Sequence, residues 1–85
     1  MEFEIYVLRG CFYSKRALRI LHRLMRHGRI DGLTYHLIDH EHKDEWKQRN
    51  KMPTFPQIFY KKNINRIRLG GLTDLEDYLA RHQMV

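Results

Sequence analysis

The feature that most constrains this chain is a change of hydrophobic period, from two to helical and back, within its first 38 residues. Residues 3–8, FEIYVL, bring a large apolar side chain to one face at every second position, which is typical of a half-buried strand. Residues 12–27 gather their apolar side chains on one face of a helix, and residues 33–38, LTYHLI, predict a second strand. Two strands joined through a helix run parallel with a right-handed crossover, so the chain opens with a β-α-β unit.

The second half of the chain predicts a short helix, a hairpin and a last helix. The polar segment 40–50, HEHKDEWKQRN, is predicted as the short helix, anchored to the core by Trp46. Residues 57–61 and 66–69, QIFYK and RIRL, predict two short strands around a tight turn. The tetrad TDLE at residues 73–76 has the form of a capping box that starts the final helix. The order β-α-β-α-β-β-α predicts an α/β fold: a four-stranded mixed sheet flanked by three helices, with helices on both faces.

Length and composition predict one small domain spanning residues 1–85. A chain of 85 residues buries one modest core, and 42% apolar residues indicate a folded protein rather than a disordered basic tail. No apolar run is long enough for a membrane span, and the start MEFE passes directly into a strand, unlike a targeting peptide. We therefore expect a cytoplasmic protein with no membrane partner, located in the host cytoplasm if its source is viral.

The chain has one cysteine, Cys11, which excludes an internal disulfide and a four-cysteine metal site within one chain. Cys11 lies between the first strand and the first helix, where unpaired N–H groups and the helix dipole favour a thiolate over a thiol. Three cations close by in the sequence are expected to stabilise that thiolate: Arg9, Lys15 and Arg16. The alternative is that Cys11 is a small buried side chain with a packing role only.

Three motifs together carry a resemblance to a known family. Residues 11–14 read CFYS after a strand, residues 54–59 read TFPQIF before the hairpin, and Gly70-Gly71 precede the last helix. The chain resembles a glutaredoxin of the thioredoxin fold, whose patterns are C-P-Y-C or C-x-x-S, T-V-P-Q-I-F and G-G-x-x-D-L. The resemblance covers nearly the whole chain, in the same order, and implies a single glutaredoxin-like domain over residues 1–85.

The resemblance implies a catalytic nucleophile and a glutathione site. Cys11 is the implied nucleophile, Pro56 the implied cis-proline facing it, and the backbone of Phe55 the implied partner of the glutathione cysteine. The implied glutathione-binding residues are Tyr13, Arg49, Lys51, Phe55, Pro56, Gly71, Leu72, Thr73 and Asp74. The start of the last helix is expected to receive the γ-glutamyl carboxylate, and Arg49 and Lys51 the glycyl carboxylate.

The sequence departs from the family pattern at four positions. Ser14 stands where a second cysteine is common, so the two-cysteine route to reducing protein disulfides is closed. Phe12 replaces the usual proline or glycine, Leu8 replaces a lysine, and Thr73 replaces an aspartate. The contacts to glutathione are therefore expected to be altered.

These features predict a monothiol glutaredoxin, a glutathione-dependent thiol-disulfide oxidoreductase that reduces glutathione mixed disulfides through Cys11. Its expected partners are glutathione, as cosubstrate, and glutathionylated proteins. An alternative is a non-enzyme in which two chains, each giving Cys11, and two glutathione thiols hold a [2Fe–2S] cluster, which needs four thiolates. The protein is expected to be a monomer unless such a cluster bridges two chains.

A second alternative is an adaptor that uses a basic helix to bind an acidic protein or nucleic acid. Between Ile5 and Ile30 there are seven Lys or Arg and no acidic residue, and four of them form a stripe: Arg16, Arg19, Arg23 and Arg26. The solvated outer face of an amphipathic helix is the more common explanation of such a stripe. Nucleic-acid binding is not expected, because no RNA-binding motif accompanies the stripe and the strand aromatics should be buried: Phe3, Tyr35 and Phe59.

No metal site is expected from the histidines. Three of them cluster near one acid in the sequence, namely His36, His40 and His42 near Asp39, and this spacing matches no standard metal site.

Overall fold

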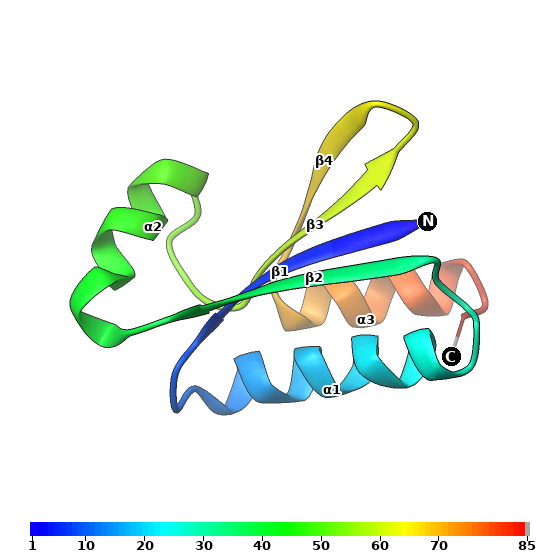
Figure 1. The fold of residues 1–85 in the computed structure, drawn as a ribbon, viewed down its shortest axis with the longest axis horizontal. Helices are drawn as coiled ribbons and strands as arrows, with labels where there is room; N and C mark the ends of the chain where they lie inside the picture. Colours follow the sequence, from blue (N-terminus) through cyan, green and yellow to red (C-terminus); the bar gives the residue numbers. More distant parts are fainter. Residues whose placement is uncertain (85) are drawn as a thin grey trace.

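The computed structural model describes residues 1–84. Its elements follow the predicted order, with a short 3₁₀ helix added ahead of the second helix (Figure 1). In chain order the elements are β1 (Glu2–Leu8), α1 (Phe12–Arg26), β2 (Gly32–Ile38), η1 (His40–His42), α2 (Lys43–Asn50), β3 (Gln57–Lys62), β4 (Asn65–Gly70) and α3 (Leu72–Arg81). None of the helices in the described part of the chain is long and apolar enough to cross a membrane.

The four strands form one mixed sheet in the order β2-β1-β3-β4. β1 and β2 are parallel, whereas β3 is antiparallel to β1 and pairs Gln57 with Tyr6. β3 and β4 form an antiparallel hairpin whose turn includes Asn63 with a positive φ of 59°. β4 therefore runs in the direction of β1, and α1 and α3, which follow these two strands, begin at the same end of the sheet (Figure 1).

One face of the sheet is covered by α1 and α3 and carries the larger core. The side chains that are almost completely buried in it come from β1, β3 and the two helices: Phe3, Ile5, Leu21, Ile58, Leu75 and Leu79. This burial follows the alternation in β1 and β3 and the helical spacing in α1 and α3, as predicted. It fixes α1 and α3 against the strands they follow.

The opposite face carries a smaller core under η1 and α2. Its buried members are Tyr6, Ile38, Met52, Phe55 and Phe59. Trp46 of α2 packs against this cluster, with its ring 5.1 Å from that of Tyr6, so it anchors the short helix as predicted. This core lies at the carboxyl end of β1, directly behind the segment that leads to Cys11.

Beyond that core, a polar cluster on β1, β2 and β4 occupies the same face. The Glu4 carboxylate accepts a bond from Arg66 Nε and lies within bonding distance of His36 Nε2, both at 2.8 Å. Burial alone raises the pKa of Glu4, but the bonds to Arg66 and His36 outweigh it and hold this pKa below the ordinary value. The Arg66 guanidinium also lies 3.6 Å from the centre of the Phe59 ring.

One predicted core residue is not in the core. Phe3 and Phe59 are buried as expected, but Tyr35 is 54% exposed, so its assignment to the core is wrong. The reason is its position at the side of the sheet: β2 is an edge strand, and the Tyr35 ring lies edge to face against the His22 ring of α1, with the ring centres 6.1 Å apart.

Candidate active site

Cys11 lies at the junction of β1 and α1. The chain turns at Gly10, which has a φ of +78°, and the Cys11 N–H donates to the Leu8 carbonyl at 3.0 Å. Cys11 itself is extended and is the N-cap residue of α1, and its carbonyl accepts the N–H of Lys15 at 3.0 Å. No side chain caps this helix start and its first turn holds no acidic residue. The half-buried thiol therefore occupies the anion-favouring end of α1 without a competing carboxylate.

Ser14, one turn into α1, has a structural contact. Its side chain is fully buried, and its Oγ accepts the backbone N–H of Leu8 at 3.1 Å. This bond ties the first turn of α1 to the end of β1 and so fixes the loop that carries Cys11. Phe12 and Tyr13 point outward instead, 69% and 60% exposed, with their rings 5.7 Å apart and edge to face.

Beside this loop is a hollow of about 400 Å³. Its lining comes from the start of α1, the loop before β3 and the start of α3: Tyr13, Thr54, Phe55, Pro56, Gly71, Leu72, Thr73 and Asp74. The Phe55–Pro56 peptide bond is cis, as the sequence motif predicted. The structure thus brings together seven of the nine residues that the resemblance assigned to glutathione binding.

The start of α3 is capped by its own first turn. The Gly71 N–H donates to Asp74 Oδ2 at 2.9 Å, and Gly71 is the N-cap residue. The predicted capping box at residues 73–76 is therefore wrong, because the helix already begins at Leu72 and Asp74 reaches back past it. Gly70 has a φ of +129°, and a Cβ on it would overlap the Asp74 carboxylate.

The other two residues assigned to glutathione lie outside that lining. Arg49 stacks its guanidinium 5.0 Å from the centre of the Trp46 ring and lies 3.8 Å from Glu45, both on its own helix. Lys51 ends α2 in a left-handed conformation, with a φ of 54°. Both cations therefore lie at the C-terminal end of α2, outside the lining of the hollow.

The three cations expected near the thiolate have different surroundings. Arg9 binds the Asp39 carboxylate at 2.6 Å, and this hydrogen bond lowers the pKa of Asp39. Arg16 lies 3.6 Å from Glu76 of α3. Lys15 has no acidic partner among the ion pairs of residues 1–84 and lines a separate hollow along α1.

Two side chains that the sequence did not single out help to build the site. Thr54 lines the hollow next to the cis peptide bond. Gln57 is fully buried: its Oε1 accepts from Asn50 Nδ2 at 2.7 Å and its Nε2 donates to the Met52 carbonyl at 3.2 Å. The sequence could have indicated this role of Gln57. It stands between a proline and the apolar run IFY, where a polar side chain must find buried hydrogen-bond partners.

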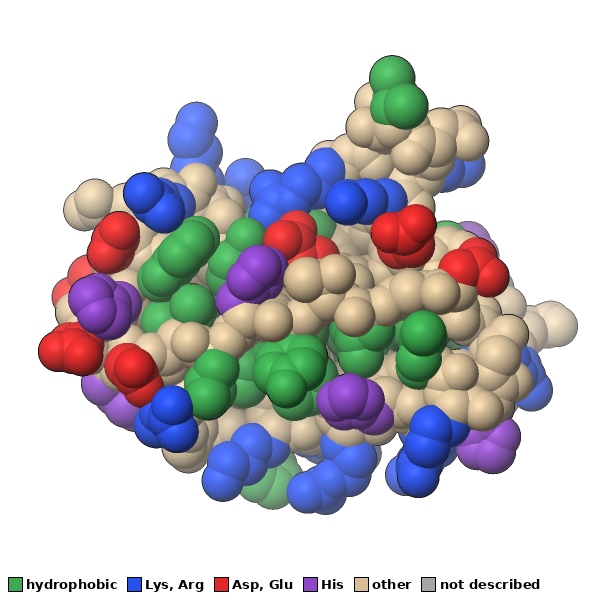
Figure 2. All heavy atoms as spheres, in the orientation of Figure 1, with side chains coloured by type: hydrophobic (Ala, Val, Ile, Leu, Met, Phe, Trp, Pro, Cys, Tyr) green, Lys and Arg blue, Asp and Glu red, His purple; other side chains and the backbone are tan. Residues whose placement is uncertain are grey.

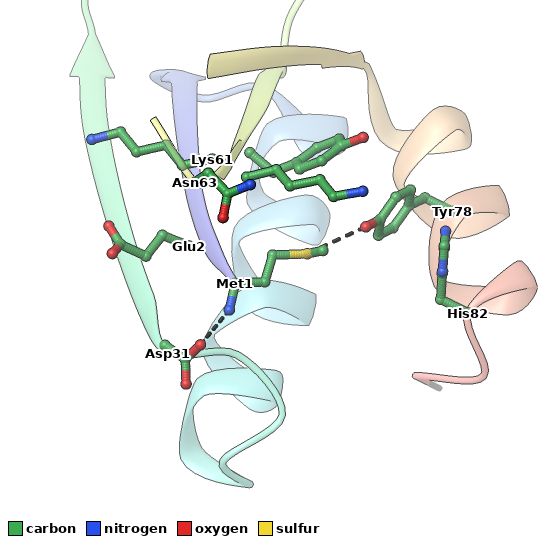
Figure 3. A pocket seen from close by; sticks show the side chains of 9 residues that line it. Met1, Glu2, Asp31, Lys61, Asn63, Tyr78 and His82 are labelled. Carbon is green, nitrogen blue, oxygen red and sulfur yellow. Dashed lines mark hydrogen bonds and ion pairs between the residues drawn. The ribbon is translucent and has the colours of Figure 1, made fainter. Parts of the chain in front are cut away.

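A second hollow, of about 510 Å³, lies at the opposite end of the sheet (Figure 3). It is lined by Met1, Glu2, Asp31, Tyr60, Lys61, Lys62, Asn63, Tyr78 and His82. The Tyr78 hydroxyl donates to Met1 Sδ at 3.3 Å, the terminal amine pairs with Asp31, and burial raises the pKa of Tyr78. No residue of this lining is close to Cys11 in the chain, whereas Tyr13, two residues after Cys11, lines the hollow at Pro56, so we place the candidate site at the Cys11 end.

The histidines near Asp39 are engaged separately rather than gathered. His36 is bonded to Glu4, His40 Nε2 lies 2.9 Å from the Arg9 carbonyl, and His42 is near two acids of its own segment, Glu41 and Glu45. Within residues 1–84 no group of three or more His, Cys, Asp or Glu side chains could hold a metal ion.

The fold and the site define a class. A parallel β-α-β unit, a hairpin and a last helix, with a thiol at the start of α1 and a cis-proline before β3, form a thioredoxin-like fold, which comparison with solved structures confirms. Reduced Escherichia coli glutaredoxin is 23% identical, with a TM-score of 0.68 and 100% of both chains covered. Another structure of E. coli glutaredoxin gives 24% identity, a TM-score of 0.61 and the same coverage. Glutaredoxin 1 from Francisella tularensis, complexed with cacodylate, gives 22% identity and a TM-score of 0.56, covering 96% of this chain and 95% of that chain.

The sequence itself assigns the family. The glutaredoxin family model matches residues 3–64, so the chain belongs to the glutaredoxin family, as its motifs predicted. No curated protein matches the chain. The family consists generally of thiol oxidoreductases that use glutathione as reductant, which gives the kind of role this site supports.

Proposed function

We propose that this protein is a monothiol glutaredoxin that reduces glutathione mixed disulfides through Cys11. The observation that carries the proposal is the position of the chain's one cysteine. Cys11 begins a helix with no acidic first turn, and the next residue but one, Tyr13, lines the hollow formed with Pro56 and Gly71. A nucleophile two residues from a side chain that lines a hollow of about 400 Å³, a volume suited to a peptide-sized cosubstrate, supports thiol exchange there.

The proposed cycle has two exchanges. The Cys11 thiolate attacks the glutathionyl sulfur of a mixed disulfide, a new Cys11–glutathione disulfide forms, and the protein thiolate leaves. A second glutathione thiolate then attacks the glutathionyl sulfur on Cys11, which releases glutathione disulfide and regenerates the Cys11 thiolate. Each step forms one S–S bond and breaks one, so no second protein thiol is required.

The hollow offers separate contacts for the two ends of glutathione. Main-chain N–H groups at the start of α3, at Leu72 and Thr73, are suited to the γ-glutamyl carboxylate. The backbone of Phe55 is suited to the cysteinyl unit, because it lines the hollow on the side of β3. Arg49 and Lys51 remain the proposed partners of the glycyl carboxylate, which would then extend beyond the hollow toward the end of α2.

The test compares two substrates made from one peptide. The protein should reduce the glutathionylated peptide in a glutathione-coupled assay and leave the peptide's intramolecular disulfide almost untouched, because the one-cysteine cycle handles only the former. Cys11→Ser should lose the activity on the glutathionylated peptide. Equal reduction of both substrates, or activity retained in Cys11→Ser, would overturn the proposal. The [2Fe–2S] alternative predicts a different result: a coloured, dimeric protein after anaerobic purification.

A further inference from the structure

The outer edge of β2 is an open backbone edge. Within residues 1–84 its one strand partner is β1, on the inner side. The Ile38 carbonyl accepts the Arg9 N–H at 2.9 Å, so the backbone groups of Ile38 face β1. Successive strand residues direct their backbone groups to alternate edges, so the N–H and C=O groups of Leu33, Tyr35 and Leu37 face outward. An open edge of this kind is a template for an added strand.

The same residues expose apolar side chains on the face that α1 covers. Tyr35 is 54% exposed and Leu37 is 48% exposed, and because they are alternate residues of β2 their apolar side chains adjoin on one face. Figure 2 shows this side of the molecule: hydrophobic side chains form a band across it, and cations line the rim below the band, where α1 lies in Figure 1. The edge therefore combines backbone groups, apolar contact area and positive charge.

The cations belong to one row along α1. A hollow of about 510 Å³ beside the row is lined by Lys15, Leu18, Arg19, His22 and Arg26. α1 contains no acidic residue, and among the ion pairs of residues 1–84 its cations have one partner, the Glu76 carboxylate near Arg16. Asp31 and Asp39, at the two ends of β2, are already paired with the terminal amine and Arg9. The charge of the row is thus not neutralised by the chain's own acids.

The spacing of the row matches that of a strand. Residues four apart on a helix are about 6 Å apart along its axis, and alternate residues on a strand are about 6.6 Å apart. Lys15 and Arg19 therefore present charge at nearly the repeat of every second residue of a strand laid on β2, and Arg26, about 10.5 Å further along the axis of α1, extends the row toward the other end of that strand. We propose that this edge binds an acidic segment of a partner protein as an added β-strand, with its acidic side chains at alternate positions facing α1.

A protein strand fits these observations better than a nucleic acid. A phosphate backbone would use the cations of α1 and could accept from the N–H groups of β2, but its phosphates have no donor for the C=O groups of that edge, whereas a peptide strand pairs with both. The apolar side chains of Tyr35 and Leu37 likewise suit a peptide, which buries them beside its own backbone. The site lies along β2 and α1, away from the hollow at Pro56, so the proposal does not depend on thiol exchange.

The first test uses a synthetic peptide and the Cys11→Ser chain. The peptide is acetylated and amidated, has about nine residues to span β2, and alternates glutamate with valine. Binding is measured by fluorescence anisotropy near physiological ionic strength, about 0.15 M, where loose charge attraction is screened. A control peptide has the same composition with all its glutamates in one block, and we expect it to bind at least about tenfold more weakly because only part of the α1 row can be met.

Backbone pairing is tested by N-methylation. Two further peptides carry N-methyl groups either on all glutamates or on all valines, and only one of these sets can face β2. We expect one set to abolish binding and the other to leave it within about twofold, since only one set of N–H groups enters the ladder. Equal affinity of the two methylated peptides would overturn the proposal, because binding would then be charge attraction alone.

Variants of the chain locate the site. Arg19→Ala with Arg26→Ala should weaken peptide binding about three- to tenfold, as expected for two partly exposed ion pairs. Lys62→Ala, at the exposed end of β3, is the matched control and should leave binding unchanged. NMR shifts confined to β2 and α1 would support the proposal. Unchanged affinity in the double variant, or tighter binding of a DNA duplex than of the peptide at the same salt concentration, would overturn it.

Discussion

α1 and α3 start side by side at one end of the sheet, yet their first turns are built in opposite ways. The start of α3 holds its own anion, because Asp74 reaches back and accepts the Gly71 N–H at 2.9 Å. The start of α1 has no acidic residue and no side-chain cap, and its N-cap residue is Cys11. The two glycines before the helices differ as well: Gly10 has open space around it, whereas Gly70 is pressed against Asp74.

The contrast separates a structural helix start from a reactive one. A carboxylate in the first turn of α1 would compete for the same N–H groups that favour a thiolate there. At α3 the carboxylate stabilises the helix and leaves its remaining first-turn N–H groups for a ligand. In the proposed function Cys11 has the chemical role and Asp74 a structural one, and the following predictions test this from the largest expected effect to the smallest.

Cys11→Ser should have the largest effect, the complete loss of mixed-disulfide reduction. Serine keeps the geometry of the N-cap position but cannot form the S–S bond that both exchanges need. Stability should stay the same or rise slightly, since serine is a good N-cap residue. The glutathione-coupled assay measures the activity, and a thermal melt measures the stability. A melt that falls together with the activity would mean that the thiol packs rather than reacts.

Gly70→Ala should strongly destabilise the protein, and Gly10→Ala should do so less. At Gly70 the new Cβ meets the Asp74 carboxylate in addition to a backbone conformation that favours glycine, so we expect a loss of about 2–4 kcal/mol. At Gly10 only the conformation is unfavourable, so we expect about 1 kcal/mol. Urea unfolding measures both free energies.

The contact to Asp74 is isolated by a double-mutant cycle. In an Asp74→Ala background, Gly70→Ala should cost clearly less than in the native chain, because the overlap is gone and the cap is already lost. Full additivity of the two substitutions would contradict the contact.

Ser14→Ala should reduce stability more than activity. It leaves the partly buried N–H of Leu8 without its acceptor, at a cost of about 1 kcal/mol, while neither exchange step uses the hydroxyl. Ser14→Cys should in addition permit some direct reduction of protein disulfides by providing a second thiol. If Ser14→Ala were as inactive as Cys11→Ser, the serine would have a chemical role and the one-cysteine cycle would have to be withdrawn.

Glu4→Gln should have the smallest effect and serves as a reference far from both helix starts. The bonds to Arg66 and His36 lower the pKa of Glu4, so its carboxylate stabilises the fold above the ordinary value of 4.5. That contribution is lost as pH falls through the lowered folded pKa. We expect a difference of about 0.5–1 kcal/mol near neutral pH that disappears in acid, with activity unchanged. A difference that grows toward acid would contradict the direction of this shift.

The fold could be predicted because the sequence patterns that define its strands and helices each lie within one short segment. Alternation in residues 3–8 and helical spacing in residues 12–27 determine the elements directly, and a helix between two strands implies their parallel pairing. The motif around Pro56 likewise predicted the cis bond. The order of the strands across the sheet was not predictable in the same way. Nothing in the sequence pattern of β2 shows that it is an edge strand, so Tyr35 was wrongly assigned to the core.

The site was predicted less evenly, because side-chain partners depend on distant segments. Arg9 is adjacent to the thiol loop in sequence, yet its partner Asp39 lies thirty residues further along. The cap of α3 comes from Asp74 rather than Thr73, because the N-cap residue is Gly71, two residues earlier than the tetrad indicated. The contact of Arg49 with Trp46 is local by contrast: the two residues are three apart on α2, so helical spacing was the available signal.

The central claim, that Cys11 alone accepts the glutathionyl group, is tested most directly by intact mass spectrometry. The reduced protein is mixed with a glutathionylated peptide in the absence of free glutathione, and the reaction is quenched with acid. We predict one glutathionyl group on the chain, located at Cys11, for each peptide thiol released. Transfer of the peptide to Cys11 in place of glutathione, or release of the peptide thiol without modification of the chain, would contradict the account.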